Sequence, residues 1–101
     1  MEEQQKVAEF ITEHDLQTPP EFRLLDLVSE LGEVAKNATE STNYGDHPKQ
    51  LDVEADEIGD VLFSLLAVAE SLDINAGEAL DQSLVKYGER IEEKDSPSSG
   101  E

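Results

Sequence analysis

The stretch EIGDVLFSLLAVAESL, residues 57–72, decides the fold. From Val61 to Ala69 it is apolar at nearly every position, with Ser64 as the exception. This run is too short to span a bilayer, which needs about 20 apolar residues. Its apolar side chains do not alternate with polar ones, as those of a half-buried strand would. A helix that is apolar on nearly all sides has to be surrounded by protein, so the stretch predicts a central helix covered by other helices.

Three further segments space their apolar residues as an amphipathic helix does. Thr18 stands before Pro19 and Pro20 and marks a helix start, and Asn75 with Glu78 forms a capping pattern for the last helix. Polar residues 41–50 form a loop. The sequence predicts an all-α fold, a four-helix bundle, with helices at Glu3–His14, Pro20–Ser41, Leu51–Leu72 and Ala76–Lys94.

Length and composition limit the class of protein. The chain has 101 residues, which fits one domain, and we expect a single helical domain at 1–94 with a disordered polar tail at 95–101. It has no cysteine, so neither a disulfide nor a thiolate metal site can form. No secretory signal opens the sequence, which favours a cytoplasmic protein.

The charge is strongly negative, because 25 acidic residues face seven basic ones and give a formal net charge of -18. Such a field repels nucleic acid and anionic membranes. The excess of acids is compatible with partial disorder. It also suits a salty cytoplasm, since the screening length at molar salt is only about 3 Å. The scarcity of lysine favours the second interpretation, in which most acids are solvated and do not by themselves indicate a metal site.

Two similar pentapeptides, ELGEV at 30–34 and EIGDV at 57–61, are the main candidates for chemistry. Each places two acids three residues apart, on neighbouring turns of one helix face. If the two helices pack antiparallel, the pairs converge, and a divalent cation would relieve their repulsion. Oxygen-only ligands select Mg²⁺ or Mn²⁺. The candidate metal ligands are Glu30, Glu33, Glu57 and Asp60.

A glycine lies inside each pentapeptide and costs a helix about 1 kcal/mol relative to alanine. A close approach of the two helix backbones at Gly32 and Gly59 would offset that cost and bring the acids together. The competing interpretation is that acid pairs at this spacing arise by chance in so acidic a chain. Glu33, for instance, points away from the stripe formed by Leu27 and Leu31, as a solvated residue would.

Lys86 and Arg90 are the candidate phosphate ligands, because they lie four residues apart on one face of the last predicted helix. They could instead complement the negative end of the helix and pair with nearby glutamates. As phosphate ligands, lysine offers a point charge and arginine a planar fork. The chain has no glycine-rich phosphate loop, so any phosphate chemistry has to use metal and side chains.

Three stretches in this order carry a family resemblance: LLDLVSELGEVAKNATE at 24–40, EADEIGDVLFSLLAVAESLDINAGEAL at 54–80, and KYGER at 86–90. Their succession resembles the MazG-like all-α nucleoside triphosphate pyrophosphohydrolases. The resemblance implies Mg²⁺-dependent cleavage between the α and β phosphates, with Mn²⁺ as a possible substitute. It implies metal binding by the four acids named above and phosphate binding by Lys86 and Arg90. It also implies a homodimer or larger assembly, often with the site between subunits.

The chain departs from the family pattern at two places. Ser29 stands where many members carry a first acid, so one ligand or base is missing, or it is supplied by Glu54 or Asp26. Residues 82–85 lack the asparagine that many members have before the lysine. The carboxylates that could accept a proton during hydrolysis are Glu33 and Glu54.

The resulting expectation is an enzyme that converts (d)NTP to (d)NMP and pyrophosphate and so cleans the nucleotide pool. We expect a nucleoside triphosphate substrate, a dimer or tetramer of this chain, and neither nucleic acid nor membrane as a partner. The alternative, which Ser29 keeps open, is a non-catalytic helical module for dimerisation or nucleotide binding.

Overall fold

The computed structural model describes residues 1–94 and contains, over that range, four α-helices and no strand. The elements are α1 (Glu2–Glu13), α2 (Pro20–Ser41), the short 3-10 helix η1 (Pro48–Gln50), α3 (Ala55–Ser71) and α4 (Ala76–Lys94). The all-α class with four helices is therefore confirmed. The polar tail expected at 95–101 lies outside the described residues.

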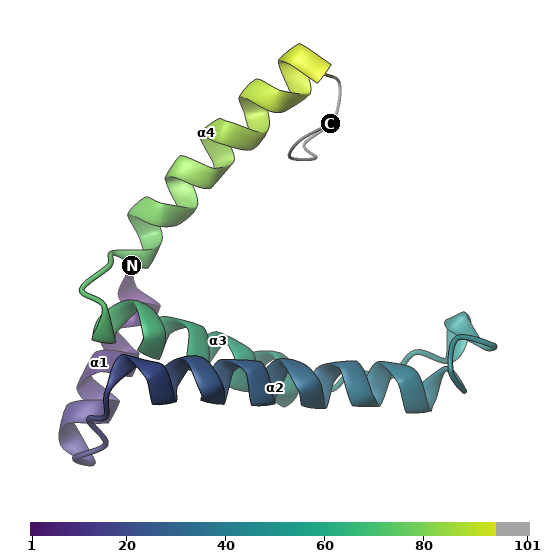
Figure 1. The fold of residues 1–101 in the computed structure, drawn as a ribbon, viewed down its shortest axis with the longest axis horizontal. Helices are drawn as coiled ribbons and strands as arrows, with labels where there is room; N and C mark the ends of the chain where they lie inside the picture. Colours follow the sequence, from purple (N-terminus) through teal and green to yellow (C-terminus); the bar gives the residue numbers. More distant parts are fainter. Residues whose placement is uncertain (95–101) are drawn as a thin grey trace.

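The third helix begins later than the sequence predicts, at Ala55 instead of Leu51. The reason is the start of α3 itself: Glu54 is its N-cap, and the Glu54 backbone N–H donates to the Glu57 carboxylate at 3.3 Å. Before it, the Asp52 backbone N–H donates to the Ser41 hydroxyl at 2.9 Å. This tie closes the loop between the helices, so that α3 runs back antiparallel along α2 (Figure 1).

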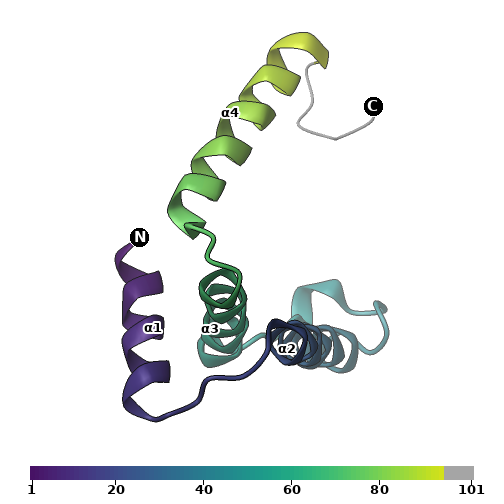
Figure 2. The same ribbon diagram turned by 60° about the vertical axis from the view of Figure 1, so that its left-hand side comes forward.

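The small core lies where α1 crosses α3. Val7 and Ile11 of α1 pack against Leu66 and Ala67 of α3. Beside them, the rings of Phe10 and Phe63 meet edge to face at 5.9 Å, a favoured geometry for an aromatic pair. α3 therefore lies between α1 on one side and α2 on the other (Figure 2).

Gln4 fastens α1 to the connection between α3 and α4. Its side chain is 5% exposed. The amide nitrogen donates to the Ile74 carbonyl at 2.7 Å and to the Glu70 carboxylate at 3.2 Å. The amide oxygen accepts from the Ala76 backbone N–H at 2.7 Å. One buried amide thus uses both of its donors and its acceptor to hold the start of α4.

α4 leaves this core and projects away from α2 and α3 (Figures 1 and 2). Among the described residues, α3 is therefore covered on two sides, by α1 and α2, and Leu62 and Leu65 remain 45% and 48% exposed. A single chain thus supplies the four predicted helices without closing them into a bundle. None of the helices within residues 1–94 combines the length and apolar character that a bilayer crossing requires.

Candidate functional site

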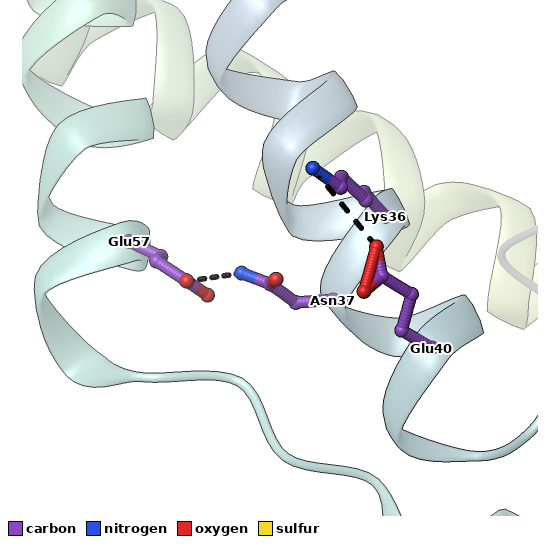
Figure 3. A network of polar contacts seen from close by, with 4 residues as sticks. All are labelled: Lys36, Asn37, Glu40 and Glu57. Carbon is purple, nitrogen blue, oxygen red and sulfur yellow. Dashed lines mark hydrogen bonds and ion pairs between the residues drawn. The ribbon is translucent and has the colours of Figure 1, made fainter.

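Glu57 is held at the seam between α2 and α3. One carboxylate oxygen accepts a hydrogen bond from the Asn37 side-chain amide of α2 (Figure 3). The other accepts from the backbone N–H of Glu54, its own N-cap. Glu57 and Asn37 are both half-buried. The acidic turn of α3 is therefore fixed to its neighbouring helix at a specific side chain.

Glu30 lies on the face of α2 that turns toward α3. Along this helix, Leu27, Glu30, Val34 and Asn37 are half-buried, at the spacing of three to four residues that defines one face. Since Asn37 touches α3, Glu30 lies on the same seam two turns earlier. The antiparallel packing on which the metal hypothesis depends is thus present.

The remaining candidates lie outside the seam. Glu33, Glu54 and Asp60 are exposed. Among residues 1–94, no group of three or more Asp, Glu or His side chains is close enough to hold a metal ion. The structure therefore brings Glu30 and Glu57 to one seam, but it does not gather all four carboxylates around one point.

The two glycines do not lie at a helix–helix contact within the chain, contrary to the sequence-based expectation. Gly32 and Gly59 are exposed. A methyl group added at either position would meet no atom within 4 Å. Both glycines face away from the seam, which α2 and α3 build with Asn37, Val34 and other larger side chains.

Lys86 and Arg90 flank one aromatic ring on α4. The lysine ammonium is 5.2 Å and the arginine guanidinium 5.7 Å from the centre of the Tyr87 ring, within the range of cation–π attraction. Neither forms an ion pair within the part of the chain that the structure describes, where Lys36 and Glu40 form one at 4.0 Å. Because α4 stands apart, these cations are not beside the acids of α2 and α3 in a single chain.

Asn37 is the site residue that the sequence reasoning missed. It lies two helical turns after Glu30, so helical periodicity places both residues on the same face of α2. An asparagine inside a helix gives no signal by itself, because its partner Glu57 is fixed only by the register between the two helices. The contact had to be seen in the structure.

Comparison with known proteins places the chain in a family. The family model of the MazG nucleotide pyrophosphohydrolase domain matches residues 17–94, which includes all three helices that carry the candidate site. The chain is also 39% identical over 72 residues to the uncharacterized protein YpjD of Bacillus subtilis (strain 168), a match that covers 67% of this chain. The match spans 63% of the length of that relative. No solved structure matches the chain. The chain belongs to the family of MazG nucleotide pyrophosphohydrolase domains.

Proposed function

We propose that this protein is a Mg²⁺-dependent nucleoside triphosphate pyrophosphohydrolase that converts (d)NTP to (d)NMP and pyrophosphate and removes unwanted nucleotides from the pool. The observation that carries the proposal is Glu57, bonded to Asn37 across the α2–α3 seam on which Glu30 also lies. The family match supports the reaction class.

The donor set fits a hard divalent cation by its chemistry. Carboxylate oxygens are the ligands that Mg²⁺ takes in proteins, with Mn²⁺ as a substitute. The residues that would hold the ion are Glu30, Glu33, Glu57 and Asp60, two on the seam and two exposed beside it. When bound, Mg²⁺ would polarise a phosphoryl oxygen and offset the negative charge of both substrate and protein.

The side chains of this protein would position the ligands, accept the proton and bind the phosphates. Asn37 holds Glu57 in place, so that little side-chain freedom is lost when ligand binds. An exposed carboxylate, Glu33 or Glu54, would accept the proton of the attacking water. Lys86 and Arg90 would bind the phosphates and stabilise the charge of departing pyrophosphate.

The proposed site requires a second copy of the chain. α2, α3 and α4 each expose an apolar stripe at helical spacing: Leu24, Val28 and Leu31; Ile58, Leu62 and Leu65; Leu80, Leu84, Tyr87 and Ile91. Unpartnered apolar surface of this extent marks an interaction site. The basic residues of α4 complement the acids beside the other two stripes, so a homodimer or tetramer would cover the stripes and bring Lys86 and Arg90 of one copy to the carboxylates of another.

A panel of nucleoside triphosphates with Mg²⁺ tests the proposal. We expect pyrophosphate and the monophosphate as products from at least one triphosphate, and no product when EDTA replaces Mg²⁺. The panel should be run at low and at molar salt, because the charge of -18 repels a triphosphate least when it is screened. Nucleotide binding without turnover in every condition would contradict the proposal and favour a non-catalytic module.

A further inference from the structure

A cavity of about 260 Å³ lies where α1, the start of α2 and the end of α3 meet. Its floor is apolar and contains Ile11 and Ala67, which are both buried. Its walls carry polar side chains, namely Thr12, Gln17, Thr18, Arg23, Glu70 and Ser71. Arg23 and Asn37 stand near opposite ends of α2, so the cavity is separate from the seam that holds Glu57.

Arg23 is the unusual member of this lining, because its side chain is only 8% exposed. One terminal nitrogen donates to the Leu16 carbonyl. Among the described residues, no carboxylate forms an ion pair with the guanidinium. Each of its nitrogens either forms a hydrogen bond or is in contact with solvent. Its unbonded nitrogens therefore keep contact with solvent, and Arg23 lines the cavity. A guanidinium keeps its charge, and a buried charge without a counter-charge is costly.

The other walls limit what kind of anion can enter. Glu70 also lines the cavity, and its carboxylate is tethered by the Gln4 amide at 3.2 Å. That negative charge repels every anion, but it disfavours multiply charged ones such as phosphate and pyrophosphate more strongly than a singly charged carboxylate that pairs with Arg23. The apolar floor of Ile11 and Ala67 instead suits a hydrocarbon body.

We infer that this cavity binds a small organic monocarboxylate, with the carboxylate on the Arg23 fork and its short apolar chain over Ile11 and Ala67. A planar guanidinium matches a carboxylate through two parallel hydrogen bonds, and it does so best where water is excluded. The inference concerns a second site and does not depend on the hydrolase activity proposed above.

Nuclear magnetic resonance of the arginine side chains gives a direct test, because the chain has only two arginines, Arg23 and Arg90. Their Nε–H signals can be assigned with the Arg90→Lys variant. Valerate serves as the probe, with inorganic phosphate and pyrophosphate as separate titrations. We expect valerate to shift the Arg23 signal saturably while the Arg90 signal stays in place. We expect neither phosphate nor pyrophosphate to shift the Arg23 signal saturably.

Two variants test the Arg23 guanidinium and the space in the cavity separately. Arg23→Lys keeps the charge but loses the fork. Ala8→Leu fills the cavity from α1 while leaving Arg23 unchanged, and it keeps the inference testable if the first variant folds poorly. We expect valerate to bind at least about tenfold more weakly to each. Glu9→Gln, an exposed change outside the cavity, should keep wild-type affinity.

Four outcomes would overturn the inference. The first is the absence of any saturable shift of the Arg23 signal by valerate. The second is an equal shift of the Arg90 signal, which would indicate general screening. The third is unchanged affinity in Ala8→Leu, which would place the carboxylate outside the cavity. A saturable shift of the Arg23 signal by phosphate or pyrophosphate would likewise contradict selection for a monocarboxylate.

Discussion

At the scale of single residues, Asn37 and Glu57 define the orientation of the acidic turn of α3. The carboxylate is bonded on one oxygen by an amide from α2 and on the other by the backbone of Glu54. A carboxylate with both oxygens bonded loses little further freedom on binding a ligand, which is the usual advantage of a preorganised site. Within residues 1–94, Glu33 and Asp60 form no such hydrogen bonds, and both are exposed.

Gly32 and Gly59 lie in helices with open space around them, which leads to a prediction about stability. Gly32→Ala and Gly59→Ala should each raise the free energy of unfolding by about 1 kcal/mol, because alanine restricts the unfolded chain and favours helix. In thermal unfolding followed by circular dichroism, the melting temperature should rise by about 4–8 °C for a domain of this size. A lower melting temperature would show that these glycines lie against a second copy of the chain.

Gln4 carries a second prediction at this scale. Gln4→Ala should lower the free energy of unfolding by about 1–3 kcal/mol, because it leaves the Ile74 carbonyl and the Ala76 N–H without their buried partner. Chemical denaturation measures the change. Gln5→Ala removes the same side chain from the exposed face of α1 and should change the stability little. Equal losses in the two variants would contradict a fastening role for Gln4.

At the scale of helices, the α2–α3 seam should respond to a divalent ion. Mg²⁺ should raise the melting temperature in proportion to the logarithm of its concentration, because it binds only the folded form. Glu57→Gln should remove most of that rise. Asp56→Asn makes the same change of charge one residue away on the exposed side of α3 and should keep the rise. A matched ionic strength of NaCl separates binding from screening, and equal rises in both variants would mean screening alone.

The sequence predicted the helices well and their contacts less well, for reasons visible in particular residues. Helical periodicity and proline placement are local signals, and they located α2 and α4 to the residue. The start of α3 was misplaced because its N-cap is Glu54, a residue type that is not a usual cap. Of the apolar residues of α2, Leu27 and Val34 are half-buried on the side of α3, whereas Leu24, Val28 and Leu31 are exposed. Which side chains of two helices meet depends on register, which no single segment encodes.

At the scale of the whole molecule, the chain is more extended than a closed bundle. Its radius of gyration is 16.6 Å, against about 13 Å for a compact chain of 100 residues. The projecting α4 accounts for the difference (Figure 1). The sequence predicts that α3 is surrounded by protein. In one chain, the side of α3 that carries Leu62 and Leu65 is exposed.

We therefore expect a dimer or tetramer in sedimentation equilibrium. Leu62→Glu places a charge in the exposed stripe of α3 and should shift the protein toward the monomer, because burying that charge in an interface is costly. Leu51→Glu, in the loop before α3, is the matched control and should leave the mass unchanged. A wild-type protein that stays monomeric at all concentrations would contradict the proposed dimer or tetramer.

Mixing inactive variants extends the same prediction to the site. Glu57→Gln and a double variant with Lys86→Ala and Arg90→Ala should each be inactive alone. After the two variants are unfolded and refolded together, half of the dimers should contain one copy of each variant. Each mixed dimer has one complete site out of two, formed by the intact acid seam of one copy and the intact α4 of the other. Roughly a quarter of the wild-type activity should therefore return. No recovery, with mixed dimers demonstrated by mass, would mean that each chain completes its own site.

We propose that the acidic turns of the α2–α3 seam carry out the hydrolysis, and the rate of pyrophosphate release by matched variants measures their contribution. With the preferred triphosphate and saturating Mg²⁺, Glu57→Gln should lose about a hundredfold or more in kcat/KM, while Asp56→Asn should stay close to the wild type. Retention of wild-type pyrophosphate release by Glu57→Gln would contradict the claim.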